Sequence, residues 1–139
     1  MKRIYPILVL TLSLFGVQNS AFAGQCAGVK LQESATLDGR ELVLNGMGQR
    51  LATFLKVKVY VAGLYVPKRS DQAQALLETD QPWQLVLSFV RSVDAGDMVK
   101  AWNEGFEKNA KAQLPQLKDR IGTLNSAMQD LEENDALVF

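Results

Sequence analysis

The sequence predicts one α+β domain, with strands in its first half and helices in most of its second half. Alternating apolar and polar residues predict strands, most clearly over residues 56–66. Apolar residues at three- and four-residue spacings predict helices between Ser92 and Leu131. Because a short turn joins the first strands, we expect an antiparallel sheet on which the helices lie.

The N-terminal residues 1–23 have the pattern of a cleaved secretory signal. A basic start at Lys2 and Arg3 precedes an apolar run over residues 7–17, and small residues follow at 21–23. A membrane anchor is disfavoured because the run is short for a bilayer span. A lipid-modified Cys26 is disfavoured because the bulky Gln25 precedes it. We therefore expect a periplasmic or secreted protein without a stable membrane anchor, whose domain comprises residues 24–139.

The composition excludes several classes of function. The 139 residues include no histidine, which removes the commonest metal ligand and the commonest general base, so we expect no metal and no cofactor. The single cysteine, Cys26, excludes an internal disulfide. Charge is nearly balanced and basic residues do not cluster with aromatic ones, which argues against nucleic acid as a partner.

The first strands form a predicted hairpin. Residues 29–37 and 41–44 flank Asp38-Gly39, a favoured two-residue turn. We expect Asn45-Gly46 to break the second strand, and Gly48 to adopt a positive φ.

A long strand should follow. Residues 49–55 continue extended with a bulge or turn near 52–54, and residues 56–66 alternate apolar and polar side chains. Pro67 ends this strand because proline cannot donate to a ladder.

Residues 71–79 predict a short helix with Leu76 and Leu77 turned inward. Residues 83–91 are apolar on one face and mostly so on the other, which predicts a strand inside the sheet.

Ser92 or Asp94 should cap a helix that runs to about Gln113. Pro115 should open another helix. The inward stripe of that helix is Leu117, Ile121, Leu124, Met128 and Leu131. Residues 136–139 begin a further strand.

The segment LNGMGQRLATFLKVKVYVAGLYVP, residues 44–67, resembles the chalcone isomerase-like superfamily, in particular its short secreted bacterial branch. A G-x-G-x-R turn leads there into a tyrosine-rich strand. The segments at 89–109 and 114–125 resemble the next elements of that family in the same order. The resemblance covers most of the chain from Val29 onward.

This resemblance implies an open-faced β-sandwich, in which a curved antiparallel sheet carries helices on one face and a ligand cleft lies between them. The family's last strands and C-terminal helix have no counterpart here, so the domain is expected to be C-terminally incomplete. The family includes plant enzymes that close a chalcone to a flavanone, and relatives that resemble fatty-acid-binding proteins.

The resemblance also implies site residues. Arg50 matches the arginine that holds an anion in both groups, and Tyr60 matches the strand tyrosine of the fatty-acid binders. The tyrosine and asparagine that the enzymes place on the helical side fall near Ala95 and Trp102, although Asn103 is one residue away. Arg50 could instead be a surface charge, and Tyr60 a core ring. The aromatic pair Trp102 and Phe106 either packs the helix on the sheet or lines an acyl tunnel.

Two functions remain open on these grounds. The first is a non-catalytic binding domain for a fatty acid or similar amphipathic carboxylate, held by Arg50 and Tyr60 and lined by Trp102 and Phe106. The second is an isomerase, an intramolecular lyase acting on a chalcone-like phenolic enone. Ala95 and Trp102 argue against the enzyme, because neither side chain replaces the expected polar groups.

Overall fold

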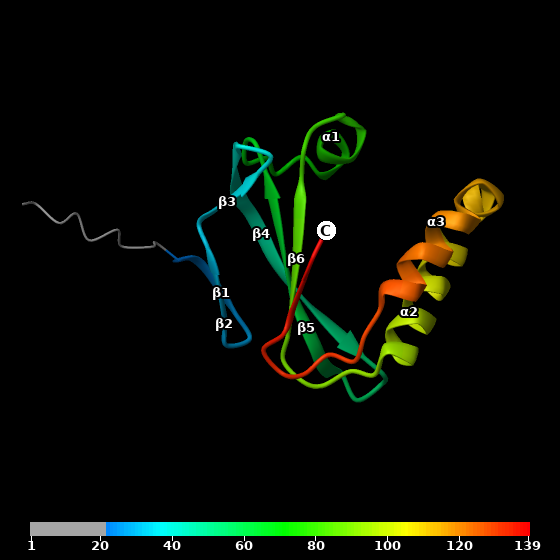
Figure 1. Ribbon diagram of the computed structural model, residues 1–139. Helices are drawn as coiled ribbons and strands as arrows, with labels where there is room; N and C mark the ends of the chain where they lie inside the picture. The colour runs from blue at the N-terminus through cyan, green and yellow to red at the C-terminus, as the bar shows by residue number, and fades with distance from the viewer. Residues whose placement is uncertain (1–21) are drawn as a thin grey trace, which may run out of the picture.

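The computed structural model describes residues 22–139 (Figure 1). The predicted signal peptide lies outside these residues, apart from its last two positions. The first part of the fold consists of β1 (Phe22–Cys26), β2 (Val29–Gln32), β3 (Ser34–Leu37), β4 (Arg40–Ala52) and β5 (Val57–Val66). The second part consists of α1 (Ala73–Glu78), β6 (Gln84–Phe89), α2 (Ala95–Asn109), a 3₁₀ turn (Lys111–Gln113), α3 (Leu114–Ala127) and β7 (Ala136–Val138).

The strands β3 to β7 form one antiparallel sheet of five strands, ordered as they occur along the chain. The sheet curls, with the β1–β2 hairpin on one side and helices α2 and α3 on the other (Figure 1). This arrangement confirms the predicted α+β class and agrees with an open-faced sandwich. The strand predicted at 83–91 is confirmed inside the sheet, since β6 pairs with both β5 and β7.

The turn predicted at Asp38-Gly39 is confirmed, but the strand predicted at 29–37 is divided, because residues 29–32 form β2 and pair with β1. Residues 34–37 of β3 pair with residues 40–43 of β4, and both turn residues have positive φ, 49° for Asp38 and 76° for Gly39. A two-residue turn with both φ values positive matches the twist of the flanking strands.

The predicted break at Asn45-Gly46 is wrong. The register between β4 and β5 shifts between Leu44 and Gly46, so Asn45 forms a bulge and the strand continues to Ala52. The Asn45 side-chain oxygen accepts a hydrogen bond from the Ser70 backbone N–H at 2.7 Å, which holds the bulge against the chain after β5. Gly48 does not adopt a positive φ, because it lies in the continuing ladder opposite Ala62.

Two apolar clusters cover opposite faces of the sheet. On the side of the β1–β2 hairpin the buried residues are Leu31, Leu42, Leu44 and Tyr65. On the side of the helices they are Leu87, Phe89, Met98 and Leu131. At Gly63 a Cβ would collide with the Leu31 side chain, so glycine at this position lets β2 lie close to β5.

The short helix α1 covers little of the core. Leu76 is half-buried, but Leu77 is 82% exposed, so the prediction that both leucines turn inward is wrong for Leu77. The helix has only six residues, too few for a full apolar stripe, and none of them is buried.

Helix α2 begins after Asp94, as predicted, but the Asp94 side chain makes no capping hydrogen bond. The Ala95 N–H donates instead to the Asp130 carboxylate, 2.9 Å away, from the segment after α3. The helix ends at Asn109, before the predicted Gln113, and the 3₁₀ turn follows.

Helix α3 carries proline in its first turn, as predicted, but ends at Ala127. Helix α3 packs on α2 and not on the sheet. Its apolar stripe is therefore only half-buried, and no residue within the helix is fully buried. Met128 and Leu131, predicted as part of the stripe, lie beyond the helix. Leu131 is buried in the apolar cluster on the helix side, and a backbone bridge to Val93 holds it there. No helix of residues 22–139 is long and apolar enough to cross a membrane.

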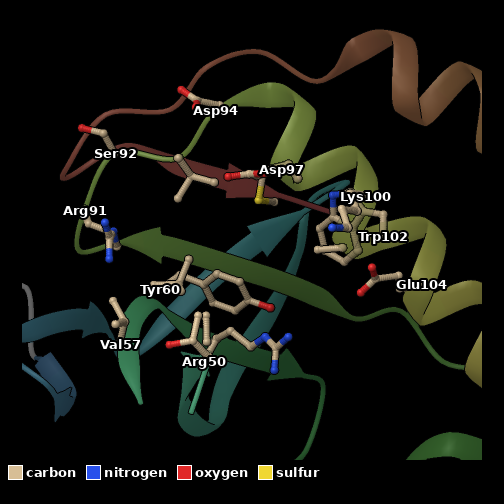
Figure 2. Close-up of a pocket in the computed structure, with 16 residues that line it drawn as sticks. Arg50, Val57, Tyr60, Arg91, Ser92, Asp94, Asp97, Lys100, Trp102 and Glu104 are labelled. Carbon is tan, nitrogen blue, oxygen red and sulfur yellow. The ribbon is translucent and has the colours of Figure 1, made fainter. Parts of the chain in front are cut away.

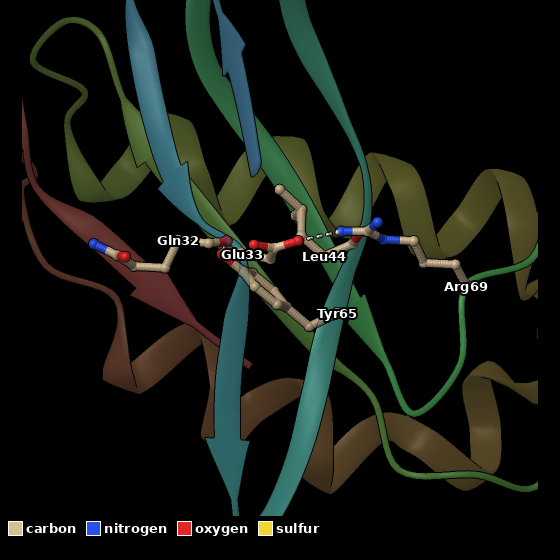
Figure 3. A network of polar contacts seen from close by, with 5 residues as sticks. All are labelled: Gln32, Glu33, Leu44, Tyr65 and Arg69. Carbon is tan, nitrogen blue, oxygen red and sulfur yellow. Dashed lines mark hydrogen bonds and ion pairs between the residues drawn. The ribbon is translucent and has the colours of Figure 1, made fainter. Parts of the chain in front are cut away.

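A network of polar contacts lies on the side of the sheet away from α2 (Figure 3). The Tyr65 hydroxyl donates to the Gln32 carbonyl at 3.0 Å, and Arg69 Nε donates to the Leu44 carbonyl at 2.9 Å. Arg69 also forms an ion pair with Glu33, with an N···O distance of 3.4 Å. These contacts tie the chain after β5 to the β2–β3 connection.

Burial raises the pKa of the Tyr65 phenol above its ordinary value. The phenol therefore loses its proton more readily in the unfolded chain, and its stabilising contribution disappears as the pH rises from about 10 through the folded-state pKa. We expect the free energy of unfolding to fall in this range, and to fall less steeply in Tyr65→Phe. Urea titrations of both proteins at rising pH measure the difference, and equal slopes would contradict the assignment.

Candidate functional site

A cleft of about 640 Å³ lies between the sheet and helix α2 (Figure 2). Its floor comes from β4, β5 and the turn between them, and its opposite wall from residues 91–104. The apolar lining consists of Ala52, Val57, Val59, Val93, Met98, Ala101 and Trp102. A volume of this size lies within the usual range of small-molecule sites, about 300 to 1,000 Å³.

Arg50 and Tyr60 lie side by side on the floor of the cleft. They are direct cross-strand partners in β4 and β5, so their side chains leave the same face of the sheet. Figure 2 shows the guanidinium and the phenol hydroxyl extending in the same direction. The structure therefore brings together the two residues that the sequence singled out.

Neither polar group is engaged by a strong partner among the described residues. Arg50 is exposed, and its Nη1 donates only to the adjacent Leu51 carbonyl, at 3.4 Å. It forms no ion pair within residues 22–139, and no hydrogen bond of the Tyr60 hydroxyl is found there. Both donors are thus available to an oxygen atom in the cleft.

A β-bulge shapes this floor. Arg50 pairs with Tyr60 and Leu51 pairs with Lys58, so Val59 is the extra residue in β5. The bulge interrupts strict alternation, and both Val59 and Tyr60 line the cleft as a result. Phe89 of β6 is the cross-strand partner of Tyr60 and packs beside it, with ring centroids 5.5 Å apart and planes inclined by 60°.

Trp102 lines the opposite wall, on α2. Its ring meets Phe139 edge to face, with centroids 5.7 Å apart. The indole Nε1 is buried and has no hydrogen-bond partner. Such a donor is uncommon in a folded protein, and an acceptor on a bound ligand would satisfy it.

Other predicted site positions are not in the cleft. Phe106 is half-buried on α2 but does not line the cleft, so its prediction as a ligand-binding residue is not supported by its position. It lies one helical turn beyond Trp102, further along α2. Asn103 does not line the cleft either. Its side chain faces α3, where its oxygen accepts a hydrogen bond from Asn125 at 3.0 Å. Ala95 is likewise absent from the lining.

A family model described as chalcone isomerase-like matches residues 23–139, which is most of the chain. The chain belongs to the chalcone isomerase-like family. No curated protein matches it. The resemblance inferred from residues 44–67 is therefore confirmed at the level of the family.

The cleft of this chalcone isomerase-like protein contains charges of both signs that sequence reasoning missed. Arg91 and Lys100 line it together with Arg50, and so do Asp94, Asp97 and Glu104. Residues 97, 100, 101 and 104 share one stripe of α2 next to Met98, and this spacing is the signal that could have revealed them. No group of three or more potential metal-ligating side chains occurs within residues 22–139.

Proposed function

We propose that this chalcone isomerase-like protein is a non-catalytic binding protein for a fatty acid or a similar amphipathic carboxylate. The observation that carries the proposal is the Arg50–Tyr60 pair, which presents two uncommitted donors on the floor of a cleft of about 640 Å³. A guanidinium can bind a carboxylate through two parallel hydrogen bonds, and the phenol adds a third donor. The pattern of residues 1–23 supports a periplasmic or secreted location.

The apolar lining supports an acyl chain as the remainder of the ligand. Val57, Val59 and Met98 face the cleft beside the polar pair. Burying each methylene group contributes about 0.8 kcal/mol, so hydrocarbon burial alone provides useful affinity without any chemistry. Glu104 on the opposite wall repels a carboxylate, which favours binding of the head group next to Arg50.

The alternative, an isomerase acting on a chalcone-like enone, receives less support. Such an enzyme would need polar groups on the helical wall to orient an oxyanion. The two positions concerned hold Ala95, which does not line the cleft, and Trp102, which offers one N–H.

Calorimetry with a series of saturated fatty acids tests the binding function. Octanoate, decanoate and dodecanoate should bind with affinity rising by about tenfold for each two added methylenes, until the chain exceeds the cleft. The methyl ester of decanoate has the same chain without the charge, and we expect it to bind much more weakly. Equal binding of acid and ester, or no binding of any acid, would contradict the proposal. Consumption of naringenin chalcone, followed by absorbance, would support the isomerase instead.

A further inference from the structure

The turn between β4 and β5, residues 53–56, carries two adjacent apolar side chains into solvent. Phe54 is 90% exposed and Leu55 is 69% exposed. Most large apolar residues of the described chain are at least half-buried, so a neighbouring pair this exposed needs an explanation.

The backbone of this turn holds the pair outward. Thr53 and Lys56, on either side of the pair, both have positive φ, 61° and 53°. The Lys56 N–H donates to the Thr53 carbonyl at 3.2 Å, and the Leu55 N–H donates to the Thr53 hydroxyl at 3.3 Å. A positive φ is rare for a β-branched residue such as Thr53, and such conformations persist where the surrounding structure supports them.

Basic residues surround the apolar pair. Lys56 and Lys58 are both exposed, and residues 49–61 contain no acidic residue. Arg91 lies close to this group, because the Val90 N–H donates to the Val59 carbonyl at 3.0 Å. The acidic residues that line the cleft, Asp94, Asp97 and Glu104, belong to the opposite wall. The pair Phe54 and Leu55 forms an apolar tip, and Lys56, Lys58 and Arg91 form a basic collar around it. This arrangement complements an anionic lipid surface, where the apolar groups enter the interface and the cations meet the head groups.

The turn is continuous with the cleft. Ala52, Thr53 and Val57 line the cleft, and Phe54 and Leu55 lie between them in the chain. If the tip enters a bilayer, the entrance of the cleft lies at the level of the lipid head groups.

We propose that residues 53–56 form a contact site for an anionic phospholipid bilayer, with Phe54 and Leu55 inserted and Lys56 and Lys58 on the head groups. The contact does not depend on the proposed ligand, because it uses the outside of the turn. A protein that binds no fatty acid can still bind vesicles through this surface.

Co-sedimentation with vesicles tests the proposal. The wild-type protein should bind vesicles of phosphatidylcholine containing one quarter phosphatidylglycerol, and bind pure phosphatidylcholine far less. The double variant Phe54→Ser/Leu55→Ser should bind the anionic vesicles about tenfold or more weakly. Leu77→Ser is the matched control, since Leu77 is 82% exposed on α1, and it should bind as the wild type does. All proteins are produced from the whole chain, with their common N-terminus verified by mass spectrometry.

A second measurement reads the position of the turn directly. In Phe54→Trp, the tryptophan emission should shift to the blue on addition of anionic vesicles, relative to the wild-type protein with Trp83 and Trp102. The shift should diminish as salt screens the basic collar. Equal sedimentation of the wild type and the double variant, an equal loss in Leu77→Ser, or no shift in Phe54→Trp would overturn the proposal.

Discussion

Arg50→Ala is expected to weaken the binding of dodecanoate by about tenfold or more. A hydrogen-bonded charged group contributes about 1.5 to 3 kcal/mol, and the lower part of this range applies because the guanidinium is exposed before the ligand binds. Arg50 forms no ion pair within residues 22–139, so its loss should leave the melting temperature nearly unchanged. Calorimetry measures the affinity, and thermal unfolding by circular dichroism measures the stability.

Three variants identify the cause of this loss. Arg40→Ala makes the same change on the same strand outside the cleft, and binding should stay at the wild-type level. Arg50→Lys keeps the charge without the planar fork, so its affinity should lie between those of Arg50→Ala and the wild type. Glu104→Gln removes from the opposite wall a negative charge that repels the carboxylate of the ligand, and it should strengthen binding. An unchanged affinity in Arg50→Ala would exclude Arg50 as the carboxylate anchor.

Phe89→Ala is expected to reduce the free energy of unfolding by about 3 to 5 kcal/mol. Phe89 is only 1% exposed and belongs to the cluster on the helix side of the sheet, together with Leu87 and Met98. Its removal leaves a void beside Tyr60, whose ring meets Phe89 edge to face. The loss is a large share of the stability of an ordinary domain, about 5 to 15 kcal/mol.

Urea unfolding followed by circular dichroism measures this loss. Phe54→Ala is the matched control, because it makes the same substitution where the ring is 90% exposed, and it should change the stability by about 0.5 kcal/mol or less. Comparable losses in the two variants would show that Phe89 does not hold the sheet and α2 together.

The sequence predicted most of the strands and both long helices, since local signals determine them, but it did not predict β1 or the division of residues 29–37 into β2 and β3. The Asp38-Gly39 turn, the alternation over 56–66 and the spacings within residues 95–127 need no information from distant residues. The errors lie where tertiary contacts decide. Asn45 forms a bulge because its side chain bonds the Ser70 backbone, 25 positions further along the chain. Likewise, α2 starts with the help of Asp130, which no pattern near Ala95 reveals.

The candidate site divides in a similar way. Arg50 and Tyr60 were found through the family resemblance, because a lone arginine and a tyrosine in a strand carry little information by themselves. Their pairing depends on the bulge at Val59, which sets the register of β5 against β4. The bulge also brings Val59 itself into the cleft, which strict alternation does not predict. On α2 the sequence treated Trp102 and Phe106 alike, but only Trp102 lines the cleft, since Phe106 lies one helical turn further along.

Only Met98 of α2 is fully buried, so the wall of the cleft contributes little to the core. Lys100, Ala101 and Glu104 line the cleft while remaining exposed, and substitutions at exposed positions usually alter stability by about 0.5 kcal/mol or less. Evolution can therefore exchange these side chains, and with them the choice of ligand, almost without endangering folding. The floor offers less of this freedom, because Tyr60 packs against the fully buried Phe89.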